Sequence, residues 1–257
     1  MPSQTIEDIL ARLNLLIDDS IRARDRAGYF AALYERVTTN VRRAIVAGNV
    51  FEDNARMGRL DVVFADRFLD AWDAHRRGGE PTAAWRVAFS VLDDPGPLVV
   101  QHLMLGMNAH INLDLGVAAA TVAPTRPELE SLRADFMTIN RILGRLLDVV
   151  ILELGQICPR FSRAQRLTFF APGLEDKLFG FGMGGARDLA WRLAEQVVAA
   201  GGPDGEAGAR VIAQRDAETA AVGRTLYPLR GFANRVAAWI HASECKDVPM
   251  NIQIIAG

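Results

Sequence analysis

The sequence has little cysteine and little net charge. Its 257 residues include only Cys158 and Cys245 as cysteines, too few for the disulfide framework of a small secreted protein. Its 29 basic and 31 acidic residues give a formal net charge of −2, which argues against nucleic acid as the main partner, because phosphate binding needs concentrated positive charge. Residues 1–26 lack the apolar core of a signal peptide. We therefore expect a cytoplasmic protein with no nucleic-acid partner.

Long hydrophobic runs are also scarce. The most apolar stretch, residues 97–123, contains no Lys, Arg or Glu, yet it includes two His, two Asn and one Asp. Five such polar groups, one of them a carboxylate, would make a membrane span costly. The sequence therefore predicts no membrane span and indicates instead a helix that carries polar groups inside a protein core.

Helical periodicity extends over almost the whole chain. Half of the residues are hydrophobic and 23% are charged, so the chain can bury a sizeable core. The pattern predicts an all-α fold, one helical domain over residues 1–257, with about nine helices around a central buried helix at about 98–120. The expected helices begin after Thr5 and then cover about 26–47, 55–77, 82–92, 98–123, 127–157, 186–200, 206–222 and 229–243. Residues 159–185 are the least regular, and the end of the chain is expected to be an irregular tail with alternating apolar residues at Met250–Ile255.

The polar residues of the central helix fall on two sides. At about 100° per residue, His102, His110 and Asp114 lie within an arc of about 120°. Asn108 and Asn112 lie on the far side. Because an unpaired buried polar group costs about 1–3 kcal/mol, all of them need partners. The two Asn either tie neighbouring helices together or contact a substrate, whereas His110, Asp114 and His102 are the candidate catalytic residues.

A second candidate group lies on the helix at about 55–77. Asp61, Phe64 and Arg67 recur at three-residue steps and share a helix face, with the two charged residues among apolar neighbours. This face is either solvated and salt-bridged or functional. In the functional interpretation, Asp61 and Arg67 bind substrate, and Arg67 anchors an anionic group or orients Asp114.

The metal signal is weak. His102 and His110 lie two turns apart, about 12 Å along the axis, so they share an ion only if the helix bends at Gly106. His110 and Asp114 would be the metal ligands if an ion is bound, with further donors from the candidates Asp61, Asp66, Asp135 and Asp148. These carboxylates follow no recognised ligand spacing. We therefore predict no cofactor and keep a divalent metal as an alternative.

A glycine-rich stretch, Gly180–Gly185, matches the dinucleotide-binding spacing G-x-G-x-x-G. That motif functions only after a buried strand in a βαβ unit, and the preceding residues 174–179 show no strand pattern. We therefore predict a loop and a helix start here, with no bound dinucleotide.

Six segments carry a family resemblance. They are RMGRLDVVFADRFLDAW (56–72), AWRVAF (84–89), HLMLGMNAHINLDLGVAAA (102–120), DFMTINRILGRLLD (135–148), ARDLAW (186–191) and FANRVAAWI (232–240). They resemble the bacterial proteins grouped as domain of unknown function 5995. The resemblance covers most of the chain and implies one helical domain, but no settled activity.

A looser likeness is to the helical zinc-dependent phospholipase C and nuclease group. His110 and Asp114 have the His-x-x-x-Asp spacing that supplies zinc ligands in that group. Those enzymes usually carry another His four residues after the Asp, where this chain has Ala118, and the chain has four His in all.

Two classes of function fit these patterns. The first is a small-molecule enzyme, a hydrolase, lyase or cyclase, whose pocket lies against the central helix and whose His/Asp pair performs acid–base chemistry on a mostly apolar metabolite. A zinc-dependent hydrolase is a variant of it. The second is a non-catalytic helical protein that binds a ligand or a partner. No pattern in the sequence specifies an oligomeric state.

Overall fold

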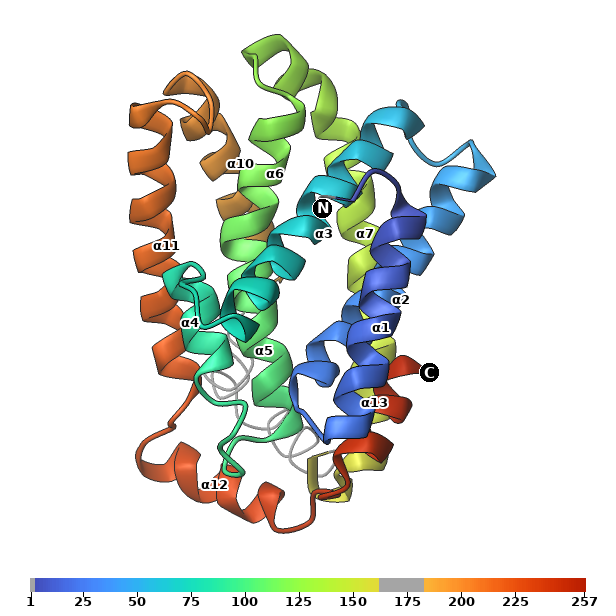
Figure 1. The fold of residues 1–257 in the computed structure, drawn as a ribbon, viewed down its shortest axis with the longest axis vertical. Helices are drawn as coiled ribbons and strands as arrows, with labels where there is room; N and C mark the ends of the chain where they lie inside the picture. The colour runs from blue at the N-terminus through green and yellow to red at the C-terminus, as the bar shows by residue number, and fades with distance from the viewer. Residues whose placement is uncertain (1–2, 162–182) are drawn as a thin grey trace.

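The computed structural model describes residues 3–161 and 183–257, and within these ranges it describes the backbone alone at residues 140–148, 151 and 183–186. Every regular element in the described ranges is helical, which confirms the all-α prediction (Figure 1). The elements are α1 (Ile6–Ala23), α2 (Ala27–Ala47), α3 (Asn54–Arg76), α4 (Ala83–Phe89), α5 (Val99–Ala109), the π-helical turn η1 (His110–Asp114), α6 (Leu115–Val122), α7 (Arg126–Ile157), α10 (Met183–Ala199), α11 (Glu206–Leu226), α12 (Gly231–His241) and α13 (Val248–Ala256). None of the described helices is both long enough and apolar enough to cross a membrane.

Local sequence signals fix several helix ends. At the start of α1, the Thr5 side chain accepts the backbone N–H of Asp8 at 3.1 Å, and the Asp8 side chain accepts the N–H of Thr5 at 3.0 Å. The same reciprocal capping box, formed by Thr125 and Glu128, opens α7. Helix α2 ends at Ala47 and is capped by Gly48, which has a φ of 77° that favours glycine. These boundaries agree with those expected from the sequence.

The end of the chain differs from the expectation of an irregular tail. Residues 248–256 form α13, which packs against α2 and α7. Val248, Ile252 and Ile255 are buried at helical spacing, and a proline in the first turn fits a helix start. The alternation at Met250–Ile255 was misleading because a window of six residues hides a helical stripe that begins at Val248.

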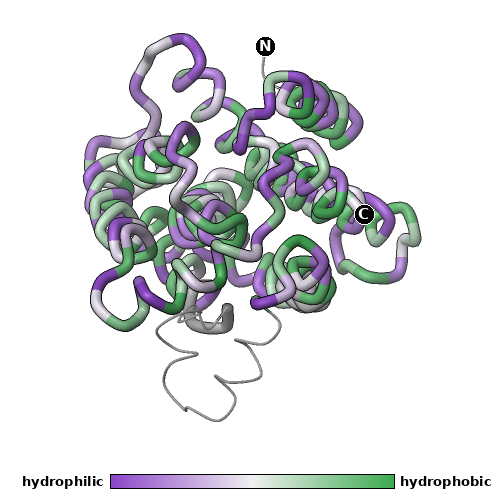
Figure 2. The backbone as a smooth tube through the Cα atoms, turned by 90° about the horizontal axis from the view of Figure 1, so that it is seen from below, coloured by the Kyte–Doolittle hydropathy of each residue, from purple (hydrophilic) through white to green (hydrophobic). Residues whose placement is uncertain are grey.

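The central helix is confirmed as a buried element. α5, η1 and α6 follow one another without a break and contact α2, α3, α4, α10 and α11. Figure 2 looks along the bundle, so that many of the helices are seen close to end-on. The described residues hold eleven α-helices and one π-helical turn, against nine predicted helices, because the central helix divides into three elements and α13 is added.

Two glycines of the central helix permit close packing. A Cβ atom on Gly106 would lie 2.4 Å from the Phe30 ring of α2, and one on Gly116 would lie 2.5 Å from the carbonyl oxygen of Ala190 in α10. Real Cβ atoms do not approach other atoms so closely, so both positions require the absence of a side chain. Gly106 therefore seats an aromatic ring against the helix, and the helical irregularity lies four residues later, at His110.

Candidate functional site

The site is built on the π-helical turn η1. The backbone N–H of Leu115 donates to the carbonyl oxygen of His110, five residues earlier, instead of four as in an α-helix. Such turns are rare and occur frequently at functional sites. The turn begins at His110 and ends at Asp114, and it brings His110 Nδ1 to 3.1 Å from Asp114 Oδ2.

Asp114 is a buried carboxylate with three side-chain donors. Arg67 Nε of α3 donates to Oδ1 at 2.8 Å, and Trp85 Nε1 of α4 donates to Oδ2 at 2.8 Å. His110 shares Oδ2 with Trp85. The carboxylate is 1% exposed, so these donors replace its hydration. Helices α3, α4 and η1 thus meet at one charged group.

The protonation states of the pair follow from this arrangement. Burial acts to raise the pKa of Asp114, but Arg67 and the hydrogen bonds from His110 and Trp85 outweigh it and hold the pKa below its usual value. Burial lowers the pKa of His110, although Asp114 opposes this effect. At neutral pH the pair is therefore an ionised Asp114 and a neutral His110, whose Nδ1 carries the proton and whose Nε2 is an acceptor.

Aromatic rings enclose His110. Its ring stacks on Phe64 with centroids 3.7 Å apart and lies edge-on to Tyr34 at 4.5 Å. The rings of Phe30, Phe68 and Trp85 complete the surroundings. Among the described residues, neither His110 Nε2 nor the Tyr34 hydroxyl has a hydrogen-bond partner. The acceptor nitrogen therefore lies in a mostly apolar environment with a phenol ring in contact.

Asp61 lies in the same region of the interior. It is 1% exposed, it stands one helical turn before Phe64 on α3, and its Oδ2 has no hydrogen-bond partner among the described residues. Burial raises its pKa to about 7. Burial raises the pKa of Tyr34 well above its usual value, and the negative charge of Asp61 adds to this shift. The site thus holds two buried carboxyl groups with opposite pKa shifts, Asp61 and Asp114.

Asn108 and Asn112 lie away from the His110 ring contacts. Asn108 Nδ2 donates to the carbonyl oxygen of Thr219 in α11 at 2.9 Å, and Asn112 Nδ2 donates to Asn108 Oδ1 at 3.0 Å. Asn112 Oδ1 has no partner among the described residues. This geometry ties the central helix to α11, as one of the two sequence interpretations expects.

His102 lies in different surroundings from His110. Its ring lies edge-on to Tyr29 at 5.6 Å, and neither ring nitrogen has a hydrogen-bond partner among the described residues. Burial lowers its pKa to about 3, and Arg26 adds to this effect. The predicted arc therefore does not become one cluster, because two helical turns separate His102 from the His110–Asp114 pair.

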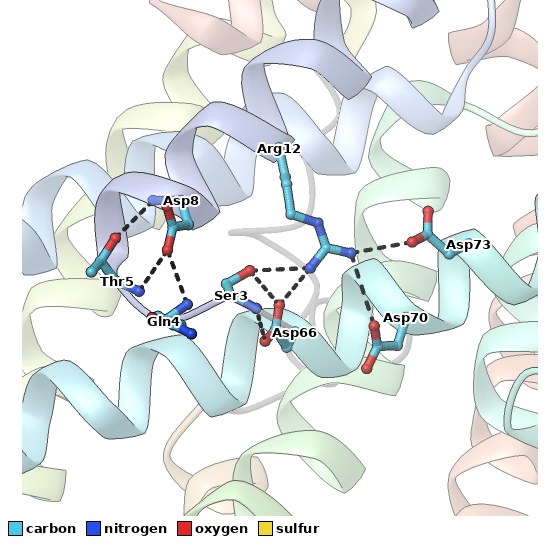
Figure 3. Close-up of polar contacts among 8 residues, drawn as sticks. All are labelled: Ser3, Gln4, Thr5, Asp8, Arg12, Asp66, Asp70 and Asp73. Carbon is cyan, nitrogen blue, oxygen red and sulfur yellow. Dashed lines mark hydrogen bonds and ion pairs between the residues drawn. The ribbon is translucent and has the colours of Figure 1, made fainter. Parts of the chain in front are cut away.

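Asp66, one of the predicted metal donors, belongs to a partly buried group of ion pairs between α1 and α3. Figure 3 shows Arg12 of α1 between Asp66, Asp70 and Asp73 of α3. Arg12 lies 2.6 Å from Asp66, and the backbone N–H and hydroxyl of Ser3 also donate to this carboxylate at 2.9 and 2.7 Å. Asp66 thus fastens the beginning of the chain to α3.

Asp135, another predicted metal donor, does not join His110 and Asp114 either. Asp135 accepts the backbone N–H groups of Glu52 and Asp53 at 2.7 and 3.1 Å and pairs with Arg56. The side chain of Asp148 lies outside the described residues. Among the side chains that the structure describes, no group of three or more His, Cys, Asp or Glu is arranged to hold a metal ion.

The structure describes only part of the glycine-rich stretch Gly180–Gly185. Residues 180–182 lie outside the described residues, and α10 begins at Met183. The prediction of a helix start near this motif fits the beginning of α10, whereas the loop itself and its lack of a dinucleotide stay predictions.

Trp85 and Tyr34 are site residues that the sequence reasoning did not single out. Both lie within apolar helix faces, and each places a polar group in the core, the indole N–H of Trp85 and the hydroxyl of Tyr34. A buried indole N–H or phenol hydroxyl usually needs a partner, and this requirement was an available signal. It could not say which partner, because Asp114 lies 29 residues from Trp85 in the sequence.

Comparison with known proteins identifies a family whose function is not known. The sequence model of the family described as "Family of unknown function (DUF5995)" matches residues 6–228, which is more than half of the chain. No curated protein and no solved structure matches the chain.

Proposed function

The chain belongs to this family of unknown function, and we propose that it is a small-molecule enzyme in which His110 acts as the general acid/base. One observation carries the proposal. Asp114 fixes the Nδ1 proton of His110, and the acceptor Nε2 is left buried without a partner among the described residues. An unpaired buried acceptor is unfavourable for stability, so its presence in the core favours a role in binding or chemistry.

The roles of the residues follow from their charges. His110 Nε2 takes a proton from a substrate hydroxyl, amine or activated carbon and returns it to the leaving group. Asp114 stabilises the imidazolium that forms, and Arg67 and Trp85 keep Asp114 ionised and oriented. The apolar rings around His110 favour a mostly apolar substrate, which fits a hydrolase, lyase or cyclase.

Asp61 supplies the complementary acid. Its raised pKa of about 7 keeps a large share of the group protonated at neutral pH, whereas Asp114 stays ionised. Pairs of titratable groups with opposite pKa shifts are typical of acid/base sites. In this proposal Asp61 donates a proton through its carboxyl group while His110 accepts one.

The test replaces the base without removing its volume. Wild-type protein and His110→Gln are incubated with a metabolite extract, and turnover is followed by mass spectrometry. We expect turnover by His110→Gln to be at least about 100-fold lower than turnover by the wild type, which is the usual contribution of a general base. His75→Gln, at an exposed histidine of α3, is the matched control and should leave turnover unchanged.

A non-catalytic binding protein is the second candidate, and the burial of His110 favours it. The ring is 3% exposed and surrounded by aromatic side chains, so it also suits a structural role. If no metabolite is turned over, but one is retained by the wild type and by His110→Gln with equal affinity, the enzyme proposal is wrong and binding is the function.

A zinc-dependent hydrolase has less support. Both oxygens of Asp114 accept hydrogen bonds, and the Arg67 guanidinium occupies the position beside Oδ1 that a cation would take. The donor set present thus does not fit a zinc ion held by His110 and Asp114. Metal analysis of the purified protein tests this alternative, since one equivalent of zinc that His110→Gln fails to retain would revive it.

A further inference from the structure

Helix α12 presents an apolar face to solvent. Within the described part of the chain it buries a single side chain, Ile240, and it lies across one end of the bundle (Figure 1). Phe232 is 69% exposed and Trp239 is 41% exposed. Large aromatic side chains are rarely left in water at two positions of one short helix without a binding role.

The exposed residues share one side of the helix. Phe232, Val236 and Trp239 lie four and seven residues apart, so at about 100° per residue they fall within about 60° of one another. Val236 is half-buried and continues the face between the two aromatic rings. The apolar face therefore runs along the length of α12.

Basic side chains lie at the start of α12 and on it, and α12 itself contains no Asp or Glu. Residues 219–243 contain three arginines and no Asp or Glu, in a chain with a net charge of −2. Arg224 lies in α11, Arg230 stands at the start of α12 and Arg235 lies on α12; all three are exposed, and none is in an ion pair with another described side chain. Arg160 adds a fourth cation, with its guanidinium 5.2 Å from the centre of the Trp239 ring.

We propose that α12 binds the surface of an anionic lipid membrane. Phe232 and Trp239 insert into the boundary between headgroups and acyl chains, where aromatic rings are favoured. The arginines contact the anionic headgroups, which attract clusters of basic residues near the surface. The inference concerns a surface separate from His110 and stands independently of the proposed enzyme activity.

The chemistry of the patch favours lipid over nucleic acid. Both partners offer phosphates to the arginines, but only a lipid surface also offers an apolar phase to Phe232 and Trp239. The low overall charge of the chain also gives little electrostatic attraction to a polyanion away from this patch. A lipid surface satisfies both the charged and the apolar parts of α12.

Trp239 makes the binding measurable in the whole protein. The other three tryptophans, Trp72, Trp85 and Trp191, are 9%, 1% and 8% exposed, so a blue shift of the emission spectrum reports Trp239. The protein is titrated with vesicles of phosphatidylcholine alone and of phosphatidylcholine with phosphatidylglycerol. We expect a blue shift and co-sedimentation with the anionic vesicles, both weakened as salt screens the charges.

Variants separate the two contributions. Phe232→Ser should weaken binding to anionic vesicles at least tenfold, and Arg230→Glu combined with Arg235→Glu should do the same. Val46→Ser, at a side chain on α2 that is 78% exposed, is the matched control and should leave binding unchanged. Circular dichroism confirms that each variant is folded.

Four results would overturn the proposal. They are equal binding to neutral vesicles, an equal loss in Val46→Ser, tighter binding to a DNA duplex than to anionic vesicles, and a blue-shifted Trp239 in a dimer formed without lipid. The last result would assign the face of α12 to a second copy of the chain.

Discussion

Replacing Asp61 by asparagine is expected to stabilise the protein at neutral pH and above. Asp61 is 1% exposed and burial raises its pKa from 3.8 to about 7. A difference of roughly three pKa units at about 1.4 kcal/mol per unit corresponds to about 4 kcal/mol of lost stability once the pH exceeds 7. Asparagine has no proton to take up but leaves its amide unpaired at a cost of about 1–3 kcal/mol. The net expected gain at pH 8 is therefore about 1–3 kcal/mol.

The pH dependence gives the sign of the effect. Between pH 3.8 and about 7, Asp61 is ionised in the unfolded chain and protonated in the folded protein. Folding takes up a proton in this window, so the contribution of Asp61 to the free energy of unfolding is complete below pH 3.8 and is lost as the pH rises to about 7. Urea unfolding of the wild type and of Asp61→Asn from pH 5 to pH 8 measures it. The stability of the variant relative to the wild type should increase by about 1.4 kcal/mol per pH unit up to pH 7 and then level off.

Asp114→Asn is the matched control, because it makes the same change at another fully buried aspartate. It should destabilise the protein by about 3 kcal/mol at pH 7, since it removes the charge that pairs with Arg67. The reasoning fails if the difference between Asp61→Asn and the wild type does not change with pH, or if Asp61→Asn is the less stable protein at pH 8. Either result would mean that Asp61 is ionised and paired in the folded state.

Two further predictions concern the packing and the end of α5. Gly106→Ala should lower the free energy of unfolding by about 1–3 kcal/mol, because the new Cβ would lie 2.4 Å from Phe30. At Gly58 a Cβ would meet no atom of another described helix within 4 Å, so Gly58→Ala should raise the free energy of unfolding by about 0.5–1 kcal/mol. Urea unfolding measures both. Equal effects at both glycines would contradict the packing argument. Burial raises the pKa of Glu244 from 4.5 to about 7, so its contribution to stability is complete below pH 4.5 and is lost by about pH 7. Glu244→Gln, which keeps an acceptor for the Val99 N–H, should flatten thermal stability across this window, and an unchanged pH profile would refute the assignment.

The sequence predicted most of the helices because their signals are local. Capping residues such as Thr5 and Thr125, the stop at Gly48 and the apolar stripes act within a few residues, and a single chain displays them. The sequence reasoning missed α13 because its local signals are weak. Its stripe is short, and its burial depends on α2 and α7, which are distant in sequence.

The sequence indicated the polar residues of the site, but not all of their partners. His110 and Asp114 stand four residues apart, so their contact could be expected from spacing alone, and the pairing of Arg67 with Asp114 was one of the interpretations considered. His102 was assigned to the same arc from its angle around the helix, although it stands two turns before His110. Its actual ring contact is with Tyr29, on another helix.

By itself the sequence determined an all-α chain with a buried central helix that carries His110 and Asp114, because periodicity and composition fix which residues must leave water. Only the tertiary structure decided the π-helical turn at His110, the convergence of Trp85 and Arg67 on Asp114, and the burial of Asp61 with no partner for its Oδ2 among the described residues. The physical reason is the range of the forces involved. Helix formation depends on neighbours within about four residues, whereas the pKa of a buried carboxyl depends on which groups other helices bring within a few ångströms.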